Sequence, residues 1–140
     1  MSRLIAQAIT VVISLLGLIH VYWAFGTRHT YAATVPEVDG RRAFSPSRSA
    51  TLAVACALFI AAALVAISGR LLEDPFPRSF VRVATIVLGV LLVARAIGDF
   101  RLLGFFKQKN RSRFARLDTL LYSPLCLALG CGVLYVIFCA

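Results

Sequence analysis

The chain has 140 residues, of which 60% are hydrophobic and only 15% are charged, and it carries a net charge of +9. Soluble globular domains usually have about 45–50% apolar and about 25% charged residues. This contrast excludes a disordered tail, a collagen-like fibre and an ordinary cytosolic domain, and the length allows one domain. Because the apolar residues form long blocks and the mean hydropathy is +0.86, the composition indicates a membrane protein.

Four apolar blocks are each long enough to cross a bilayer, which requires about 20 mostly apolar residues per helix. They cover residues 4–25, 49–69, 80–100 and 119–139. Ser47 or Ser49 can cap the second block at its start, Gly69 ends it, and Asp118 or Thr119 can cap the fourth. The pattern predicts four transmembrane helices.

The first block could also be read as a secretory signal, because Arg3 precedes it. The apolar run is too long for that, and His20, Tyr22 and Trp23 follow where a small-residue cleavage site would stand. We therefore interpret it as an uncleaved helix. Residues 1–140 are expected to form a single all-α domain, a polytopic four-transmembrane-helix bundle.

The orientation of the bundle follows from the basic residues between the blocks. Ten Lys and Arg residues fall in the first and third connections, against four near the N-terminus and the second connection. Basic connections stay in the cytoplasm, so both termini are expected to be periplasmic. Because the bases alternate with apolar blocks, anionic headgroups of membrane lipids are the expected partners, and nucleic acid is not.

Polar residues that are unfavourable inside a bilayer gather at one expected depth, near the cytoplasmic side. They are His20, Trp23, Arg95, Asp99, Asp118 and Tyr122. Ionisable groups within a span usually face the bundle interior or a wet cavity. Arg95 and Asp99 are four residues apart, so they share a helical face and can pair. The coincidence of these groups predicts a polar pocket on the cytoplasmic side of the bundle.

Each of these residues also has a purely structural interpretation. Arg95 and Asp99 can simply neutralise each other, and His20 can form a hydrogen bond between helices. Asp118 stands where a helix N-cap is common. Trp23 and Tyr122 fit the aromatic belt of a membrane interface. These alternatives stay open on sequence grounds.

Pro124 and several small residues are interpreted as features of helix geometry. Pro124 leaves the carbonyl of Leu120 without its helical donor, so a kink is expected in the fourth span. Small side chains let helices approach closely, and packing within one bundle is the expected use of Ala61, Ala62, Ala63, Gly89, Gly130 and Gly132.

The ligand sets of common cofactors and metals are missing from the sequence. Its cysteines form no C-x-x-C pair, which argues against a zinc knuckle or a redox pair. Paired histidines for haem are missing, and His29 lies outside the spans. Neither a cofactor nor a metal is expected. Buried, apolar packing is the expected role of Cys56, Cys126, Cys131 and Cys139.

The first connection, over residues 27–48, contains a turn signal at Pro36–Gly40. Its length suggests a segment that folds over the bundle as a lid. The third connection begins with an apolar and aromatic stretch over residues 101–106 and then turns strongly basic. This pattern is typical of an interfacial extension of the third span.

Three motifs resemble one family of small, four-span bacterial membrane proteins catalogued as a domain of unknown function. They are HVYWAFG at His20–Gly26, RAIGDF at Arg95–Phe100 and DTLLYSPLCL at Asp118–Leu127. The first motif ends in Phe-Gly, where Gly-Gly is expected in many relatives. The resemblance covers almost the whole chain and implies a bacterial inner-membrane bundle. It groups the six polar residues into one site and implies no activity.

Three functions remain open on these grounds. The favoured one is binding of a small amphiphilic or anionic ligand, lipid- or quinone-like, with a role as a transport accessory as one form of this function. Arg95 would donate to its head, Asp99 would hold Arg95, His20 and Tyr122 would add hydrogen bonds, and Trp23 would stack. The alternatives are a membrane enzyme with a His/Asp acid-base pair acting on a lipid-like substrate, and a structural subunit of a larger membrane complex. A channel is least favoured.

Overall fold

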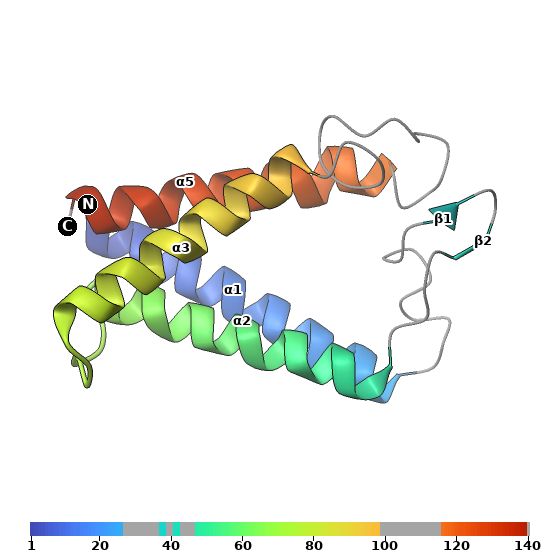
Figure 1. Ribbon diagram of the computed structural model, residues 1–140, viewed down its shortest axis with the longest axis horizontal. Coiled ribbons are helices and arrows are strands. Elements are labelled where there is room, and N and C mark those ends of the chain that lie inside the picture. Colours follow the sequence, from blue (N-terminus) through green and yellow to red (C-terminus); the bar gives the residue numbers. More distant parts are fainter. Residues whose placement is uncertain (27–36, 39–40, 43–46, 99–115, 140) are drawn as a thin grey trace.

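The computed structural model describes residues 1–26, 37–38, 41–42, 47–98 and 116–139. Its elements are α1 (Ser2–Phe25), β1 (Glu37–Val38), β2 (Arg41–Arg42), α2 (Arg48–Ser68), α3 (Arg78–Ile97), the π-helical turn η2 (Asp118–Tyr122) and α5 (Ser123–Cys139). We refer to η2 and α5 together as the fourth helix. The architecture is the expected all-α four-helix bundle, with one minimal strand pair in the first connection (Figure 1).

All four long helices have the length and apolar composition of a membrane span. Most of their large apolar side chains point outward, and Leu15, Val90 and Leu120 are 53%, 54% and 75% exposed. In water this surface would be unfavourable by about 25 cal/mol per Å² of apolar area. The bundle is therefore an integral membrane protein, and the prediction of four spans is confirmed.

The ends of α2 follow the expected signals, whereas the end of α3 does not. Ser47 caps α2, because its Oγ accepts a hydrogen bond of 3.1 Å from the amide of Ala50, and Gly69 ends the same helix. α3 ends at Ile97 and not near residue 100. Gly98 has φ of 91°, a left-handed conformation that glycine adopts without strain and that stops the helix.

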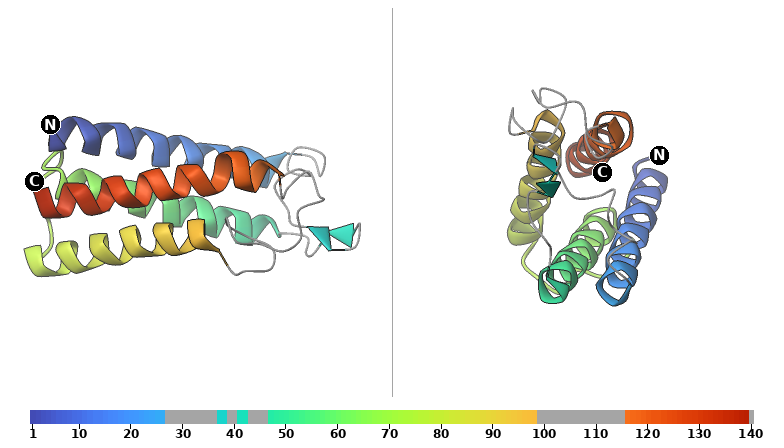
Figure 2. Two further views of the ribbon diagram at one scale, coloured as in Figure 1. Left: turned by 90° about the horizontal axis from the view of Figure 1, so that it is seen from above. Right: turned by 90° about the vertical axis from the view of Figure 1, so that its right-hand side faces the viewer.

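The helices form two antiparallel pairs. α1 packs mainly against α2, and α3 packs mainly against α5 (Figure 2). The two chain termini and the α2–α3 connection lie at one end of the bundle, which we call the terminal end (Figure 1). The C-terminal ends of α1 and α3 and the N-terminal ends of α2 and the fourth helix lie at the opposite end, which we call the loop end (Figure 1). Towards the loop end the α1–α2 pair and the α3–α5 pair diverge (Figure 1).

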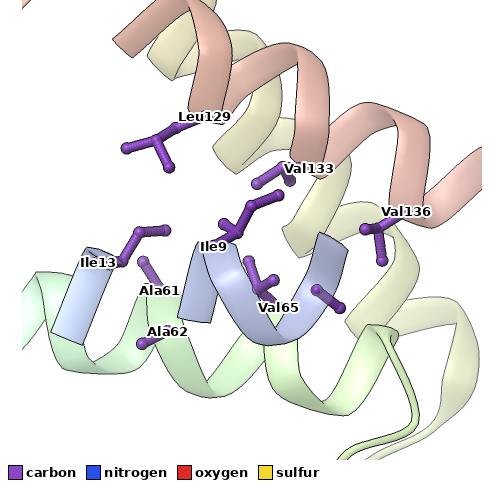
Figure 3. Close-up of a cluster of buried hydrophobic side chains, with 9 residues drawn as sticks. Ile9, Ile13, Ala61, Ala62, Val65, Leu129, Val133 and Val136 are labelled. Carbon is purple, nitrogen blue, oxygen red and sulfur yellow. The ribbon is translucent and has the colours of Figure 1, made fainter. Parts of the chain in front are cut away.

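The shared hydrophobic core lies in the terminal half of the bundle. Ile9 and Ile13 of α1, Val65 of α2, and Val133 and Val136 of α5 are at most 6% exposed. Their side chains point toward one another from three helices (Figure 3). The leucines that extend this core toward the loop end are Leu16, Leu58, Leu88, Leu92 and Leu125.

Glycines bring α3 and α5 into close contact, as expected from the small residues. A Cβ at Gly130 would lie 2.9 Å from the carbonyl oxygen of Gly89 and 3.0 Å from the amide nitrogen of Val93. Gly89 in turn faces the side chain of Leu134. Backbone approach of this kind supplies van der Waals contact where lipid removes the hydrophobic driving force.

A short strand pair stands in the first connection. Glu37 pairs with Arg42 and Val38 with Arg41 in antiparallel register, on either side of the Asp-Gly positions 39 and 40 of the expected turn. The turn residues lie outside the described residues. The expected interfacial extension over residues 101–106 also lies outside them, as does most of the expected lid.

The cysteines are a correction to the sequence analysis. Cys56, Cys131 and Cys139 are exposed on the bundle surface, and Cys126 is half-buried. The expectation of burial was wrong because a thiol is apolar enough to face lipid. In a membrane span, an apolar residue does not have to point inward.

Candidate functional site

The inward faces of the helices change from apolar to polar toward the loop end. On α1, Ile13 and Leu16 pack into the core. His20 and Trp23 stand seven residues further along the same helix. Seven residues are nearly two helical turns and shift the direction of a side chain by only about 20°. His20 and Trp23 therefore continue the core-facing stripe of α1 beyond the end of the core.

The same spacing holds on the opposite pair. On α3, Arg95 follows the core-packed Leu88 by seven residues, and on the fourth helix Tyr122 precedes the buried Leu129 by seven. Polar residues thus replace apolar ones on three inward stripes at one level of the bundle. Such residues within a membrane usually face a bundle interior or a wet cavity and mark function.

An ion pair joins α3 to the start of the fourth helix at this level. Nη2 of Arg95 donates to Oδ1 of Asp118 over 2.8 Å. The side chain of Asp118 is 0% exposed and that of Arg95 is 32% exposed. The pair is formed across the helix–helix contact, so it fixes the guanidinium of Arg95 relative to both helices.

One nitrogen of the guanidinium remains unused. Nη1 of Arg95 is buried and has no hydrogen-bond partner among the described residues. Guanidinium carries five N–H donors in a fixed planar fork and no acceptor. Arg95 is therefore held on one side by Asp118 and presents a desolvated donor on another.

Two expectations about these residues change with the structure. Asp118 is not the N-cap: helical residues precede it, and the cap position of η2 is Leu117. Its carboxylate binds Arg95 instead. Asp99 lies outside the described residues, and α3 ends before it at Ile97. The four-residue spacing therefore no longer places Asp99 on the helical face of Arg95, and a contact between them stays a prediction.

A π-helical turn carries Asp118 and Tyr122 into the fourth helix. The amide of Ser123 donates to the carbonyl of Asp118, five residues earlier. Pro124 follows and has no amide hydrogen, so the helix reaches the proline through a widened turn. Turns of this kind are frequent at functional sites. Ser123 is 0% exposed, and its Oγ has no hydrogen-bond partner in the described ranges.

His20 and Trp23 form the second part of the site. Nδ1 of His20 lies 2.8 Å from the carbonyl oxygen of Leu16. A carbonyl only accepts, so Nδ1 carries the hydrogen, and in the neutral ring Nε2 is the acceptor. The ring of Trp23 lies against that of His20, with centroids 5.0 Å apart and planes inclined by 60°. The expectation that the two share a face is confirmed.

Five of the six predicted residues therefore form two groups, and the sixth, Asp99, lies outside the described residues. Arg95, Asp118 and Tyr122 stand on the α3–α5 pair, whereas His20 and Trp23 stand on the α1–α2 pair. Both groups stand on the loop-end halves of their helices, at the end where the two helix pairs diverge (Figure 1). Arg95 and Asp118 are in direct contact, as are His20 and Trp23.

Sequence reasoning missed the role of Arg48. Its Nε donates to the carbonyl of Ala24 over 3.1 Å, and its guanidinium carbon lies 5.6 Å from the ring centroid of Phe25. It thus satisfies a free carbonyl at the end of α1 from the first residue of α2. Two features of the sequence indicated this role. Arg48 directly follows Ser47 at the start of the second span, and Phe25 stands at the end of the first.

The arrangement offers hydrogen-bond donors, an imidazole acceptor and aromatic surface. The described part of the chain contains no group of three His, Cys, Asp or Glu side chains able to hold a metal ion. The arrangement can therefore bind a molecule whose polar head accepts hydrogen bonds and whose apolar part lies between the helices.

Comparison with known proteins identifies the family. A family model described as "Protein of unknown function (DUF3995)" matches residues 13–133. The chain belongs to this family. No curated protein and no solved structure matches it. The match includes α2 and α3 in full, parts of α1 and of the fourth helix, and both groups of polar residues, and it assigns them no activity.

Proposed function

We propose that this member of the family binds an amphiphilic ligand at the loop end of the bundle. The polar head lies at Arg95 and the apolar tail lies between the α1–α2 and α3–α5 pairs. The observation that supports this most directly is the buried Nη1 of Arg95, which has no acceptor among the described residues.

An unused buried donor is costly. Leaving a buried polar group without a partner costs about 1–3 kcal/mol, and more for a charged one. A ligand that accepts from Nη1 removes this cost at the moment it binds. Asp118 holds Nη2 at 2.8 Å, so the free edge of the guanidinium is already oriented and little side-chain entropy is lost on binding.

The surroundings of Arg95 suit the remainder of an amphiphile. On the terminal side of Arg95, the inward faces of α1, α2 and α5 are apolar and meet in the hydrophobic core. Towards the loop end, Trp23 and Tyr122 provide half-buried aromatic rings on different helix pairs. Ligand sites of this kind are mostly apolar, with a few placed polar groups that fix orientation.

The loop end is proposed to face the cytoplasm of a bacterium, across the inner membrane, with both termini periplasmic. The C-terminal ends of α1 and α3, after which the first and third connections begin, lie at the same end of the bundle (Figure 1). We expect the ten basic residues of these connections to gather on that side of the membrane, where anionic headgroups bind them. A ligand that enters from the cytoplasmic leaflet would reach Arg95 first, which suits an accessory role in transport.

The membrane-enzyme alternative gains no support from the geometry of the described residues, and Asp99 lies outside them. An acid-base pair would need His20 close to Asp118 or Asp99. His20 stands on the α1–α2 pair and Asp118 on the α3–α5 pair, where its carboxylate binds Arg95. Binding therefore remains the function that the described residues support best.

The test is mass spectrometry of small molecules that remain bound to the protein after purification in mild detergent. Arg95→Ala is compared with the wild type and with Arg82→Ala, a matched control, because Arg82 is an exposed arginine on the same helix. We expect one species to be retained by the wild type and by Arg82→Ala and lost from Arg95→Ala, while all three keep the same helical circular dichroism. Equal retention by all three folded proteins, or no retained species in any, would contradict the proposal.

A further inference from the structure

We infer that the connection between α2 and α3 binds a phospholipid whose head carries both a phosphate and a primary ammonium, as in phosphatidylethanolamine. The residues that form this surface are exposed, and we call them the connection surface: Arg70, Leu72, Glu73, Phe76, Arg78 and Phe80. The connection lies at the terminal end (Figure 1), away from Arg95. The inference is therefore independent of the ligand site proposed above.

The connection surface stands at the boundary of the membrane. α2 ends at Ser68 and α3 begins at Arg78, and both helices have the length and apolar composition of membrane spans. Residues 69–77 are therefore expected at the level of the lipid headgroups. Lipid is the molecule next to this surface in the membrane, so the chemistry of the surface decides which head it prefers.

Three apolar side chains of this surface point outward. Leu72, Phe76 and Phe80 are 57%, 54% and 57% exposed. The rings of Phe76 and Phe80 lie against each other, with centroids 5.8 Å apart, and the amide of Phe76 donates to Oδ1 of Asp74 over 3.1 Å. Aromatic and apolar groups at a membrane boundary enter the zone between headgroups and acyl chains. We therefore expect the upper part of the acyl chains to cover them.

Arg70 is held in a conformation that an arginine rarely adopts. Its φ is 55°, in the left-handed region, where glycine is the usual residue after a helix. The backbone alone completes this helix end: the amide of Arg70 donates to the carbonyl of Ile67 over 2.9 Å, and the next amide donates to that of Ala66 over 2.8 Å. The guanidinium forms no hydrogen bond or ion pair with the described part of the chain. An unpaired charge on an unfavourable backbone conformation indicates a role outside the fold.

Arg78 is also placed against the preference of its helix. It is the first residue of α3, where the helix dipole favours acidic side chains and disfavours basic ones. It is exposed, and it has no ion-pair partner among residues 1–26, 47–98 and 116–139. Free guanidinium groups therefore stand at both ends of the connection. Guanidinium matches phosphate well, because it can donate two parallel hydrogen bonds.

The carboxylates between the two arginines decide the type of head. Glu73 and Asp74 are exposed, and within the described structure neither forms an ion pair with Arg70 or Arg78. They would repel an anionic head, and a head without N–H donors would leave them unpaired. A head with a phosphate and a primary ammonium matches both signs, because the guanidinium groups donate to the phosphate and the ammonium donates to Glu73.

Two further exposed arginines stand near this end. They are Arg3 on α1 and Arg82, one turn further along α3. A positive charge there attracts the phosphate that every phospholipid carries, so it does not select among heads. Selection is left to Glu73. A primary ammonium has N–H donors for this carboxylate, and the trimethylated ammonium of phosphatidylcholine has none.

An indole placed in the connection surface reports which lipid touches it. Phe76→Trp is combined with Trp23→Phe, which removes the single tryptophan of the chain, and the protein is reconstituted in vesicles of two lipids. Lipids with brominated acyl chains quench an indole on contact, so brominating each lipid in turn gives their relative affinity for the connection surface. Phe138→Trp in the same background is the matched control, because Phe138 is 63% exposed near the end of α5.

We expect phosphatidylethanolamine to bind about fivefold more tightly than phosphatidylcholine at the Phe76→Trp reporter, in the upper range for an exposed ion pair. The ratio should be close to one at the Phe138→Trp reporter. Glu73→Gln and Arg70→Gly should each bring the ratio at the first reporter close to one, whereas Arg70→Lys should keep most of the preference. Arg70→Gly should not lower the midpoint of thermal unfolding, because glycine suits the left-handed position.

Four results would overturn the inference. One is equal affinity for the two lipids at the Phe76→Trp reporter, and another is tighter binding there of phosphatidylglycerol, whose head is anionic and has no ammonium. The third is the same preference at both reporters, since it would then belong to the whole protein surface. The fourth is an Arg70→Gly variant that unfolds at lower temperature and keeps the preference, which would make Arg70 only a helix cap.

Discussion

Arg95 of α3 and Asp118 of the fourth helix are 23 residues apart in the sequence and form an ion pair of 2.8 Å in the folded chain. The pair closes the α3–α5 contact at the loop end, beyond the shared core. Among the described residues the pair engages Nη2 and leaves Nη1 without an acceptor, so the link between the helices also positions a donor. Structural and binding roles therefore meet in one side chain, and experiments must separate them.

The structural role of the pair is measurable by a double-mutant cycle. Arg95→Ala and Asp118→Ala should each lower the free energy of unfolding by about 1–3 kcal/mol, because each leaves a charged partner behind. The double variant should lose less than the sum of the two, since it removes both charges together. Unfolding in mixed detergent micelles, followed by circular dichroism, gives the four values. Strictly additive losses would show that the two side chains do not interact.

The close approach of α3 and α5 predicts different responses at two glycines of the same helix. A Cβ at Gly130 meets backbone atoms of Gly89 and Val93 at 2.9 Å and 3.0 Å. Gly130→Ala should therefore destabilise the bundle by about 1–3 kcal/mol, the usual cost of overpacking.

Gly132→Ala is the matched control for that change. Its Cβ would meet Cδ1 of Ile9 at 2.7 Å, which is the far end of a flexible side chain. Movement of Ile9 and the higher helix propensity of alanine, worth up to about 1 kcal/mol, should leave stability nearly unchanged. The midpoint of thermal unfolding in detergent measures both. Equal losses in the two variants would contradict the α3–α5 contact described above.

Arg48 is predicted to stabilise the α1–α2 pair at the loop end. Arg48→Ala removes the hydrogen bond to the carbonyl of Ala24 and the contact with Phe25. The expected loss is about 0.3–1 kcal/mol, typical of a cation at a helix C-terminus. Amide hydrogen exchange should localise the loss to the last turn of α1. Arg3→Ala, at the exposed start of α1, should leave that turn unchanged, and faster exchange in both variants would argue against a cap.

The orientation of the bundle is testable with fusions after Ala140. Alkaline phosphatase is active only outside the cytoplasm, and green fluorescent protein exported in unfolded form is dark. A periplasmic C-terminus should therefore give an active phosphatase fusion and a dark fluorescent fusion. The reverse pair of results would place the loop end, with Arg95, on the periplasmic side.

Much of the fold could be predicted from the sequence because its signals are local. Hydropathy located the four spans, Ser47 and Gly69 marked the ends of α2, and the spacing of His20 and Trp23 placed them on one face. Each of these features depends on residues within a few positions of one another. In a membrane the length and polarity of a segment decide its structure almost alone.

The partner of Arg95 could not be read from local spacing. Asp99 was the nearest candidate in sequence, whereas Asp118 reaches Arg95 only through the packing of α3 against the fourth helix. Gly98 was the overlooked signal, since a left-handed glycine ends the helix before Asp99. The exposed cysteines have a different cause: apolar content does not distinguish a lipid-facing position from a buried one.

A crystal structure of the protein purified with its native lipids and grown in a lipidic mesophase tests the binding site most directly. The decisive observation is the partner of Nη1 of Arg95. We expect a non-protein molecule whose head lies within hydrogen-bond distance of Nη1 and whose tail runs between the α1–α2 and α3–α5 pairs. A chain atom bonded to Nη1, with the two helix pairs closed on each other at the loop end, would contradict ligand binding at this site.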